Sequence, residues 1–144
     1  MIYTVQTKKA LALCFDAHKA QKDKSGMPYV FHPFHLAEQM KDEKTTVAAL
    51  LHDVVEDTDI SFDDLLAMGF ETEIIDALRL LTHDENIDYF DYVKNIKLNP
   101  IAKVVKLADL SHNSDLTRFE EFEIDERILE RNKKYKKAIE ILEG

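Results

Sequence analysis

The sequence predicts an all-α fold, and three observations carry this prediction. The chain has only 3 glycines and 3 prolines among 144 residues, too few for the many tight turns of a β-sandwich or barrel. Apolar residues recur at helical spacing, as in Ile74, Ile75, Leu78 and Leu81. A chain of 144 residues is long enough for one domain with a hydrophobic core, and it is too short for two such domains. We therefore expect a single domain over residues 1–144.

Capping residues and helix breakers divide the N-terminal part of this domain. Thr7 is a candidate N-cap for a helix over residues 8–20, and residues 22–28 have the composition of a loop. Pro33 suits the first turn of a helix that runs to Met40. We therefore expect two helices separated by one loop before the middle of the chain.

The middle of the chain predicts a buried central helix followed by a short one. Thr45 or Thr46 is expected to cap the central helix, which is apolar on every face over residues 47–51, as in a helix that its neighbours bury. Ser61 begins a Ser-x-x-Asp capping box, and Gly69 is placed to end that short helix.

The C-terminal half predicts four more helices separated by polar segments. Their expected ranges are 71–82, 89–98, 101–110 and 125–142. The basic run over residues 131–137 is interpreted as the solvent-exposed face of the last helix, and an electrostatic attraction for a polyphosphate is the alternative.

Four ionisable side chains interrupt the apolar central helix: His52, Asp53, Glu56 and Asp57. Burying a charge without a partner costs several kcal/mol, so such a segment implies a metal ion or mutual pairing. On one continuous helix, His52 and Glu56 would be four residues apart and would share a face, as would Asp53 and Asp57. The alternative is an acidic helix end exposed to solvent.

Two further polar residues in apolar surroundings are candidate metal ligands. His32 stands directly before Pro33, and Asp109 lies within an apolar helical segment. Divalent ions in hydrolytic sites take imidazole and carboxylate ligands. His18, His35 and His112 are interpreted as structural or peripheral, and His83 receives no role. These histidines are set apart because a surplus histidine near a site is common.

Composition excludes several classes of partner. The formal net charge of −9 argues against nucleic-acid and membrane-surface binding, because both partners are polyanions. The single Cys14 rules out an intrachain disulfide and favours a reducing, cytoplasmic location. The sequence contains no apolar run of 18 residues and no signal-peptide pattern. A small anionic ligand remains compatible with the charge, and the oligomeric state is left open.

Three motifs in a fixed order resemble a known family. They are PYVFHP at 28–33, LLHDVVEDT at 50–58 and KLAD at 106–109 followed by His112 and Asn113. This order is similar to that of the HD-domain metal-dependent phosphohydrolases. The closer resemblance is to the hydrolase domain of Rel/SpoT-type alarmone enzymes and the small stand-alone alarmone hydrolases.

The resemblance implies a complete set of roles. It implies an HD-domain helical bundle and one Mn²⁺ ion, with the following ligands: His32, His52, Asp53 and Asp109. It implies that Glu56 and Asp57 orient or deprotonate the attacking water, and that Lys24 and Asn113 contact the substrate. The implied activity is guanosine-3′,5′-bis(diphosphate) 3′-pyrophosphohydrolase, with no nucleotide-synthesising half.

The sequence departs from the family pattern at two positions expected to contact the substrate. Asp23 precedes Lys24 where the family usually has arginine, and Asp115 stands where an arginine usually helps to hold phosphate. Lys22 and Arg118 are candidates to substitute for these cations. Two alternatives therefore stay open: hydrolysis of another nucleotide or phosphorylated cofactor, and a non-catalytic nucleotide-sensing module.

Overall fold

The all-α fold class is confirmed. The computed structural model describes all 144 residues and contains no strand, only an isolated bridge between Lys22 and Pro28. The elements are α1 (Val5–His18), α2 (Phe31–Glu38), α3 (Glu43–Leu51), α4 (Val54–Asp57), α5 (Phe62–Ala67), α6 (Thr72–Leu81), α7 (Tyr89–Lys97), α8 (Pro100–Asn113), η1 (Leu116–Arg118), η2 (Glu121–Glu123) and α9 (Glu126–Glu143).

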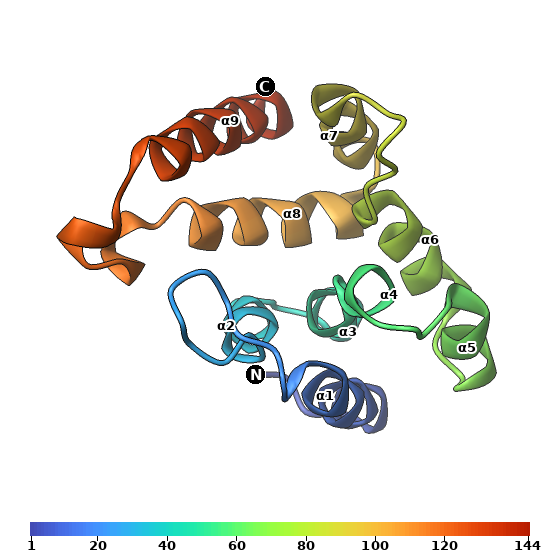
Figure 1. Cartoon of the computed structure of the whole chain (residues 1–144). Helices are drawn as coiled ribbons and strands as arrows, with labels where there is room; N and C mark the ends of the chain where they lie inside the picture. Colours follow the sequence, from blue (N-terminus) through green and yellow to red (C-terminus); the bar gives the residue numbers. More distant parts are fainter.

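Helix α8 lies across the middle of the molecule (Figure 1). It contacts α2, α3 and α6 on one side and α7 and α9 on the other. Helix α3 is buried from Thr45 to Leu51, and it packs on α1, α2 and α8. The site residues on α3 and α8 are therefore held by the most buried part of the fold.

Two of the predicted helix starts are wrong, and one is confirmed. The N-cap of α1 is Thr4, which forms a capping box with Thr7. The N-cap of α3 is Asp42, whose carboxylate accepts a hydrogen bond from the Thr45 N–H, so neither Thr45 nor Thr46 caps this helix. Serine, threonine and aspartate are all good caps, and only the backbone path selects among neighbours. The capping box that begins at Ser61 is confirmed.

The predicted continuous central helix is also wrong, because the chain turns at the His-Asp pair. Helix α3 ends at Leu51, and Asp53 adopts φ −110° and ψ 2°, outside the helical region. Helix α4 then resumes at Val54. Consequently His52 and Glu56 do not share one helix face, and each approaches the site from its own helix end.

The C-terminal helices follow the predicted order with one extension. Helix α8 runs to Asn113 rather than ending at residue 110, so His112 and Asn113 are helical. Asn99 caps α8 and Pro100 occupies its first turn, where a missing N–H costs no hydrogen bond. No helix in the chain has both the length and the apolar character that crossing a bilayer requires.

Candidate metal centre and active site

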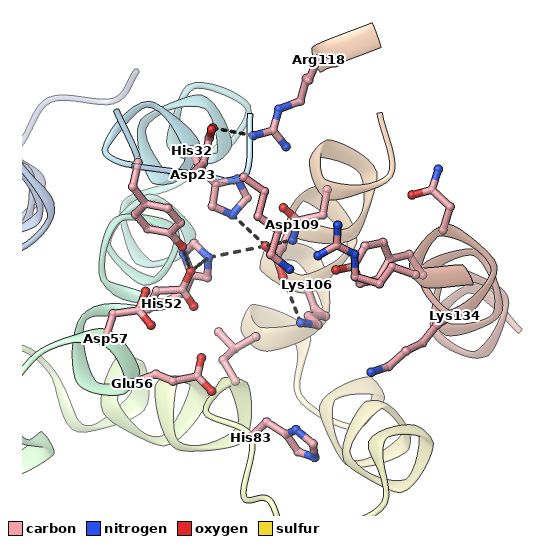
Figure 2. A pocket seen from close by; sticks show the side chains of 18 of the residues that line it. Asp23, His32, His52, Glu56, Asp57, His83, Lys106, Asp109, Arg118 and Lys134 are labelled. Atoms are coloured by element: carbon pink, nitrogen blue, oxygen red, sulfur yellow. Dashed lines mark hydrogen bonds and ion pairs between the residues drawn. The ribbon is translucent and has the colours of Figure 1, made fainter. Parts of the chain in front are cut away.

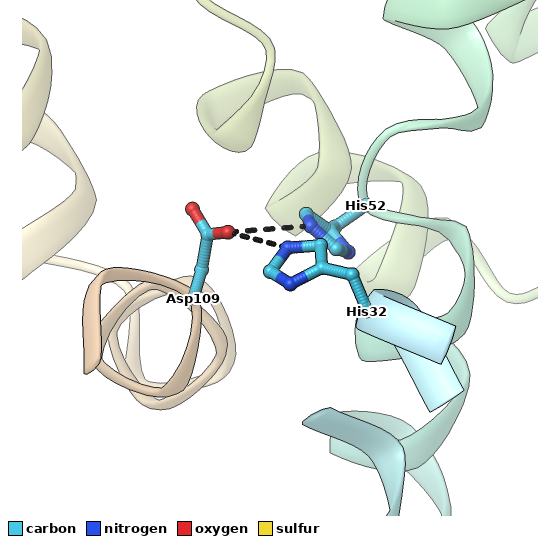
Figure 3. A group of neighbouring side chains, drawn as sticks. All are labelled: His32, His52 and Asp109. Carbon is cyan, nitrogen blue, oxygen red and sulfur yellow. Dashed lines mark hydrogen bonds and ion pairs between the residues drawn. The ribbon is translucent and has the colours of Figure 1, made fainter. Parts of the chain in front are cut away.

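Three predicted metal ligands from three separate helices converge in the interior. His32 lies in the first turn of α2, His52 follows the end of α3, and Asp109 lies on α8. One potential ligand atom from each lies within 4.8 Å of the others, and all three side chains are buried. Figure 3 shows the two imidazoles facing the Asp109 carboxylate. We call these three residues the imidazole–carboxylate cluster.

The cluster contains a buried nitrogen without a hydrogen-bond partner, which fits a metal site. His52 Nδ1 lies 2.6 Å from the Ala49 carbonyl oxygen, and a carbonyl only accepts, so Nδ1 carries a proton. His52 Nε2 lies 3.0 Å from Asp53 Oδ2 and 3.7 Å from Asp109 Oδ1 but makes no hydrogen bond of acceptable geometry. Buried polar atoms rarely stay unpaired, so Nε2 is available to a cation.

Asp53, the fourth predicted ligand, lies beside the cluster rather than within it. Its Oδ2 accepts a hydrogen bond from the Tyr29 hydroxyl. Burial, together with the Asp53 charge, raises the pKa of Tyr29, so this phenol stays protonated and donates. Asp53 is thus oriented by Tyr29 within reach of His52 Nε2, and it offers a second carboxylate to an ion bound there.

Asp109 is surrounded by donors that keep it ionised. Its Oδ1 lies 2.8 Å from His32 Nε2 and 3.0 Å from Asn113 Nδ2, and its Oδ2 lies 2.9 Å from Lys106 Nζ. Burial alone would raise the pKa of Asp109, but the Lys106 ammonium and the His32 hydrogen bond hold this pKa well below its usual range. Asn113, predicted to contact substrate, therefore also bonds to a predicted metal ligand.

His112, interpreted from the sequence as structural or peripheral, touches the cluster directly. Its Nδ1 lies 2.7 Å from His32 Nδ1, and the two rings stack with centroids 4.9 Å apart. Burial and the nearby positive charges of Arg118, His32 and His35 lower the pKa of His112 to about 4. A neutral His112 can pair with the second ring nitrogen of His32, as metal-binding histidines usually require.

Glu56 and Asp57, the predicted catalytic pair, lie on α4 beside the cluster (Figure 2). Both side chains are exposed at the cavity, and their partial desolvation, together with the negative charge of Asp53, raises the pKa of each carboxyl. A carboxylate with a raised pKa is a better proton acceptor than an ordinary surface carboxylate. The raised pKa values of the pair are those expected of a proton acceptor.

The cluster and the catalytic pair open on one cavity of about 660 Å³. Its wall also includes Lys24, Arg131 and Lys134, which we call the cationic wall. None of these three makes an ion pair with a carboxylate. Burial lowers the pKa of Lys24, and the like charges of Arg131 and Lys134 lower it further. In a chain of net charge −9, this concentration of unpaired cations favours an anionic ligand.

The two departures from the family pattern have different structural outcomes. Asp23 lines the cavity and forms an ion pair with Arg118 at 2.9 Å. Asp115 does not line the cavity; it caps η1, where its Oδ1 accepts hydrogen bonds from the N–H and hydroxyl of Thr117. Asp115 therefore places no negative charge in the lining of the cavity.

Several residues of the site are not predicted as such from the sequence. Tyr29 and Lys106 were visible inside the motifs, but their contacts with Asp53 and Asp109 need the fold. The basic run over residues 131–137 is largely exposed, as predicted, but Arg131 and Lys134 also line the cavity, which was only the alternative interpretation. Their spacing of three residues on a helix was the available signal that they share a face.

The HD domain family matches residues 10–116 of this chain. Among curated proteins, the chain is 33% identical to a GTP pyrophosphokinase of Streptomyces coelicolor, with 96% of this chain and 17% of that protein aligned. It is 34% identical to a probable guanosine-3′,5′-bis(diphosphate) 3′-pyrophosphohydrolase of Synechocystis, and the alignment covers 73% of this chain and 16% of that protein. It is also 34% identical to a guanosine-3′,5′-bis(diphosphate) 3′-pyrophosphohydrolase of Borreliella burgdorferi, where the alignment covers 73% of this chain and 18% of that protein.

A solved structure resembles the whole chain. It is described as a metazoan ortholog of SpoT that hydrolyzes ppGpp and plays a role in starvation responses. The TM-score is 0.76 at 27% identity, and the match covers 100% of this chain and 89% of that one. The chain thus spans 16–18% of the length of the curated relatives above but nearly all of this structural relative.

Proposed function

The chain belongs to the HD domain family, and we propose that it is a metal-dependent guanosine-3′,5′-bis(diphosphate) 3′-pyrophosphohydrolase. We further propose that residues 1–144 form a single HD phosphohydrolase domain. The observation that carries the proposal is one shared cavity, in which the imidazole–carboxylate cluster, the pair Glu56 and Asp57, and the cationic wall all meet. Each of these three parts suits one requirement of phosphate ester hydrolysis.

The first requirement is a divalent ion, and we propose Mn²⁺. Two imidazoles with carboxylate oxygens form a mixed nitrogen and oxygen donor set, which suits a transition metal better than Mg²⁺ or Ca²⁺. The ligands would be His32, His52, Asp53 and Asp109. Such an ion, when bound, lowers the pKa of water and polarises a phosphoryl oxygen.

The chain's own residues supply the proton acceptor and the substrate contacts. Glu56 or Asp57 accepts the proton of the attacking water, since both have raised pKa values and border the cluster. The water oxygen bonds to the phosphorus attached at the 3′ oxygen of the ribose, the bond between that phosphorus and the 3′ oxygen breaks, and the 3′ oxygen takes up one proton, equal to the one that the carboxylate removed from water. The products are pyrophosphate and GDP. The cationic wall and Asn113 bind the phosphates of the substrate.

The test is product analysis with a panel of nucleotides and phosphorylated cofactors. The Mn²⁺-loaded protein is incubated with each compound and the products are resolved by chromatography, with Asp53→Ala as the blank. We expect fastest release of pyrophosphate from guanosine tetraphosphate. Faster hydrolysis of another nucleotide would contradict the proposed substrate but leave the proposed metal-dependent phosphohydrolase chemistry in place. Binding without turnover of any compound would favour a sensing module and contradict the proposal.

A further inference from the structure

The loop over residues 22–28 is shaped by the Asp23 carboxylate. Asp23 Oδ1 accepts hydrogen bonds from the Ser25 N–H at 2.9 Å, the Ser25 hydroxyl at 2.6 Å and the Met27 N–H at 3.0 Å. The Asp23 N–H donates to the Met27 carbonyl at 2.8 Å. These local bonds are those of an aspartate-stabilised turn, so the shape of the loop needs only one carboxylate oxygen.

The second oxygen of Asp23 reaches a residue 95 positions away. Asp23 Oδ2 accepts from Arg118 Nη2 at 2.9 Å, and Arg118 Nη1 donates to the His112 carbonyl at 3.0 Å. The guanidinium thereby joins the loop to the C-terminal end of α8. The side chains of Asp23 and Arg118 are only 13% and 18% exposed, so this ion pair is shielded more than a surface pair.

The two partners differ in what they can still offer a ligand. The Asp23 carboxylate accepts three hydrogen bonds at Oδ1 and one at Oδ2, and an ionised carboxylate has no N–H or O–H to donate to an anion. Arg118 uses two of its five N–H groups, and three have no protein partner. Both residues line the cavity that holds the cluster and the cationic wall, and Figure 2 shows the ion pair at its edge. Only the arginine therefore has free donors for a bound anion.

The position of the pair favours a ligand-binding role over a purely structural one. Lys24 follows Asp23 directly and belongs to the cationic wall. A guanidinium held at two points keeps its remaining N–H groups in a fixed direction, and this lowers the entropic cost of binding an anion. An ion pair needed only to join two segments would not have to lie in the wall of the substrate cavity.

We propose that Arg118 binds an anionic group of the nucleotide and that Asp23 is the positioning residue that holds the guanidinium in the cavity wall. This inference rests on the proposed function, because it requires a phosphorylated nucleotide as ligand. Asp23, a departure from the family pattern, would then hold in place an arginine that comes from a distant part of the chain.

The experiment measures binding of GDP and of guanosine by calorimetry, so it does not depend on turnover. The variants are Arg118→Gln, Asp23→Asn and the double variant. Asparagine keeps an acceptor oxygen for the turn and removes the charge that faces Arg118. The control is Arg127→Gln, which removes the arginine of an exposed Asp125–Arg127 pair outside the main cavity. Circular dichroism checks that each variant is folded, and Arg118→Lys replaces Arg118→Gln where it is not.

We expect Arg118→Gln to weaken GDP binding at least about tenfold and to leave guanosine binding unchanged. Asp23→Asn should weaken GDP binding about threefold or more, and the double variant should resemble Arg118→Gln alone. Unchanged GDP affinity in Arg118→Gln, equal losses for guanosine, or no GDP binding by the wild type would each overturn the inference. Tighter binding in Asp23→Asn would overturn the positioning role. Failure to release pyrophosphate from guanosine tetraphosphate, with the GDP results intact, would refute only the proposed function.

Discussion

The end of the cavity that holds the imidazole–carboxylate cluster is buried and densely hydrogen-bonded, whereas the end with the cationic wall is more exposed and its charges lack carboxylate partners. Every ligand atom of the cluster except His52 Nε2 has a protein partner. In the cationic wall, none of Lys24, Arg131 and Lys134 forms an ion pair with a carboxylate. Under the proposed function, the cluster is already ordered before a ligand binds, whereas the cationic wall gains its partners only when an anion binds.

This difference predicts that substitutions at the cluster and the catalytic pair alter kcat and metal affinity. Substitutions in the cationic wall should alter KM. The largest effect is expected at the catalytic pair. Glu56→Gln or Asp57→Asn should lower kcat by about 10²–10⁴, because the proton acceptor is lost. Steady-state kinetics with the Mn²⁺-loaded variants measures the change. A higher KM with unchanged kcat would indicate that these residues bind the substrate and do not accept the proton.

The same pair predicts a pH effect of known sign on stability. Partial desolvation raises the folded-state pKa of Glu56, so this group stabilises the fold while protonated, and that contribution is lost as pH rises through the raised pKa. Glu56→Gln should therefore raise the Tm of the metal-free protein at about pH 7.5. The difference should shrink towards about pH 4.5, near the usual glutamate pKa. A Tm difference independent of pH would contradict the desolvation argument.

His112 is expected to have an intermediate effect, seen in metal affinity. When His32 Nε2 binds a cation, its ring proton lies on Nδ1 and is donated to His112 Nδ1. His112→Phe keeps the ring but removes this acceptor, so Mn²⁺ affinity should fall about 10–100-fold. The matched control is His35→Phe, on the ring that packs against His112. Equal losses in both variants would indicate a role in packing only.

The smallest effect is expected at the cationic wall. Lys134→Gln should raise KM up to about tenfold with little change in kcat, because one phosphate contact of several is lost. Lys133→Gln is the control, since Lys133 is exposed and pairs with Glu130. The Lys134 effect should also weaken as salt is raised, because exposed charges are screened. A fall in kcat without a KM change would contradict this division between the two ends.

The contrast also explains how much could be predicted from sequence. The helices and the cluster were predictable because His32, His52 and Asp109 are polar residues in apolar surroundings, a signal that is local. The turn between the end of α3 at Leu51 and the start of α4 at Val54 was not predictable, since no glycine or proline marks it. The pairing of Asp23 with Arg118 crosses 95 positions, so no spacing rule could indicate it.

The capping errors have a related physical origin. Asp42, Thr45 and Thr46 are all competent N-caps, and capping preferences differ among them by less than the packing energy that fixes the start of α3. His112 and Asn113 were expected in a polar segment, yet they continue α8, where Asn113 Nδ2 donates to the Asp109 carboxylate four residues earlier. The sequence signals thus predicted which helices form more closely than where each helix begins and ends.

The central claim, that His32, His52, Asp53 and Asp109 bind one divalent ion, is tested most directly by counting bound metal. Equilibrium dialysis against Mn²⁺ followed by elemental analysis gives the number of ions per chain. We expect about one ion per chain in the wild type and almost none in His52→Gln or Asp109→Asn, with folding checked by circular dichroism. The account would be contradicted by wild-type protein that binds no ion, or by folded variants that bind as tightly as the wild type.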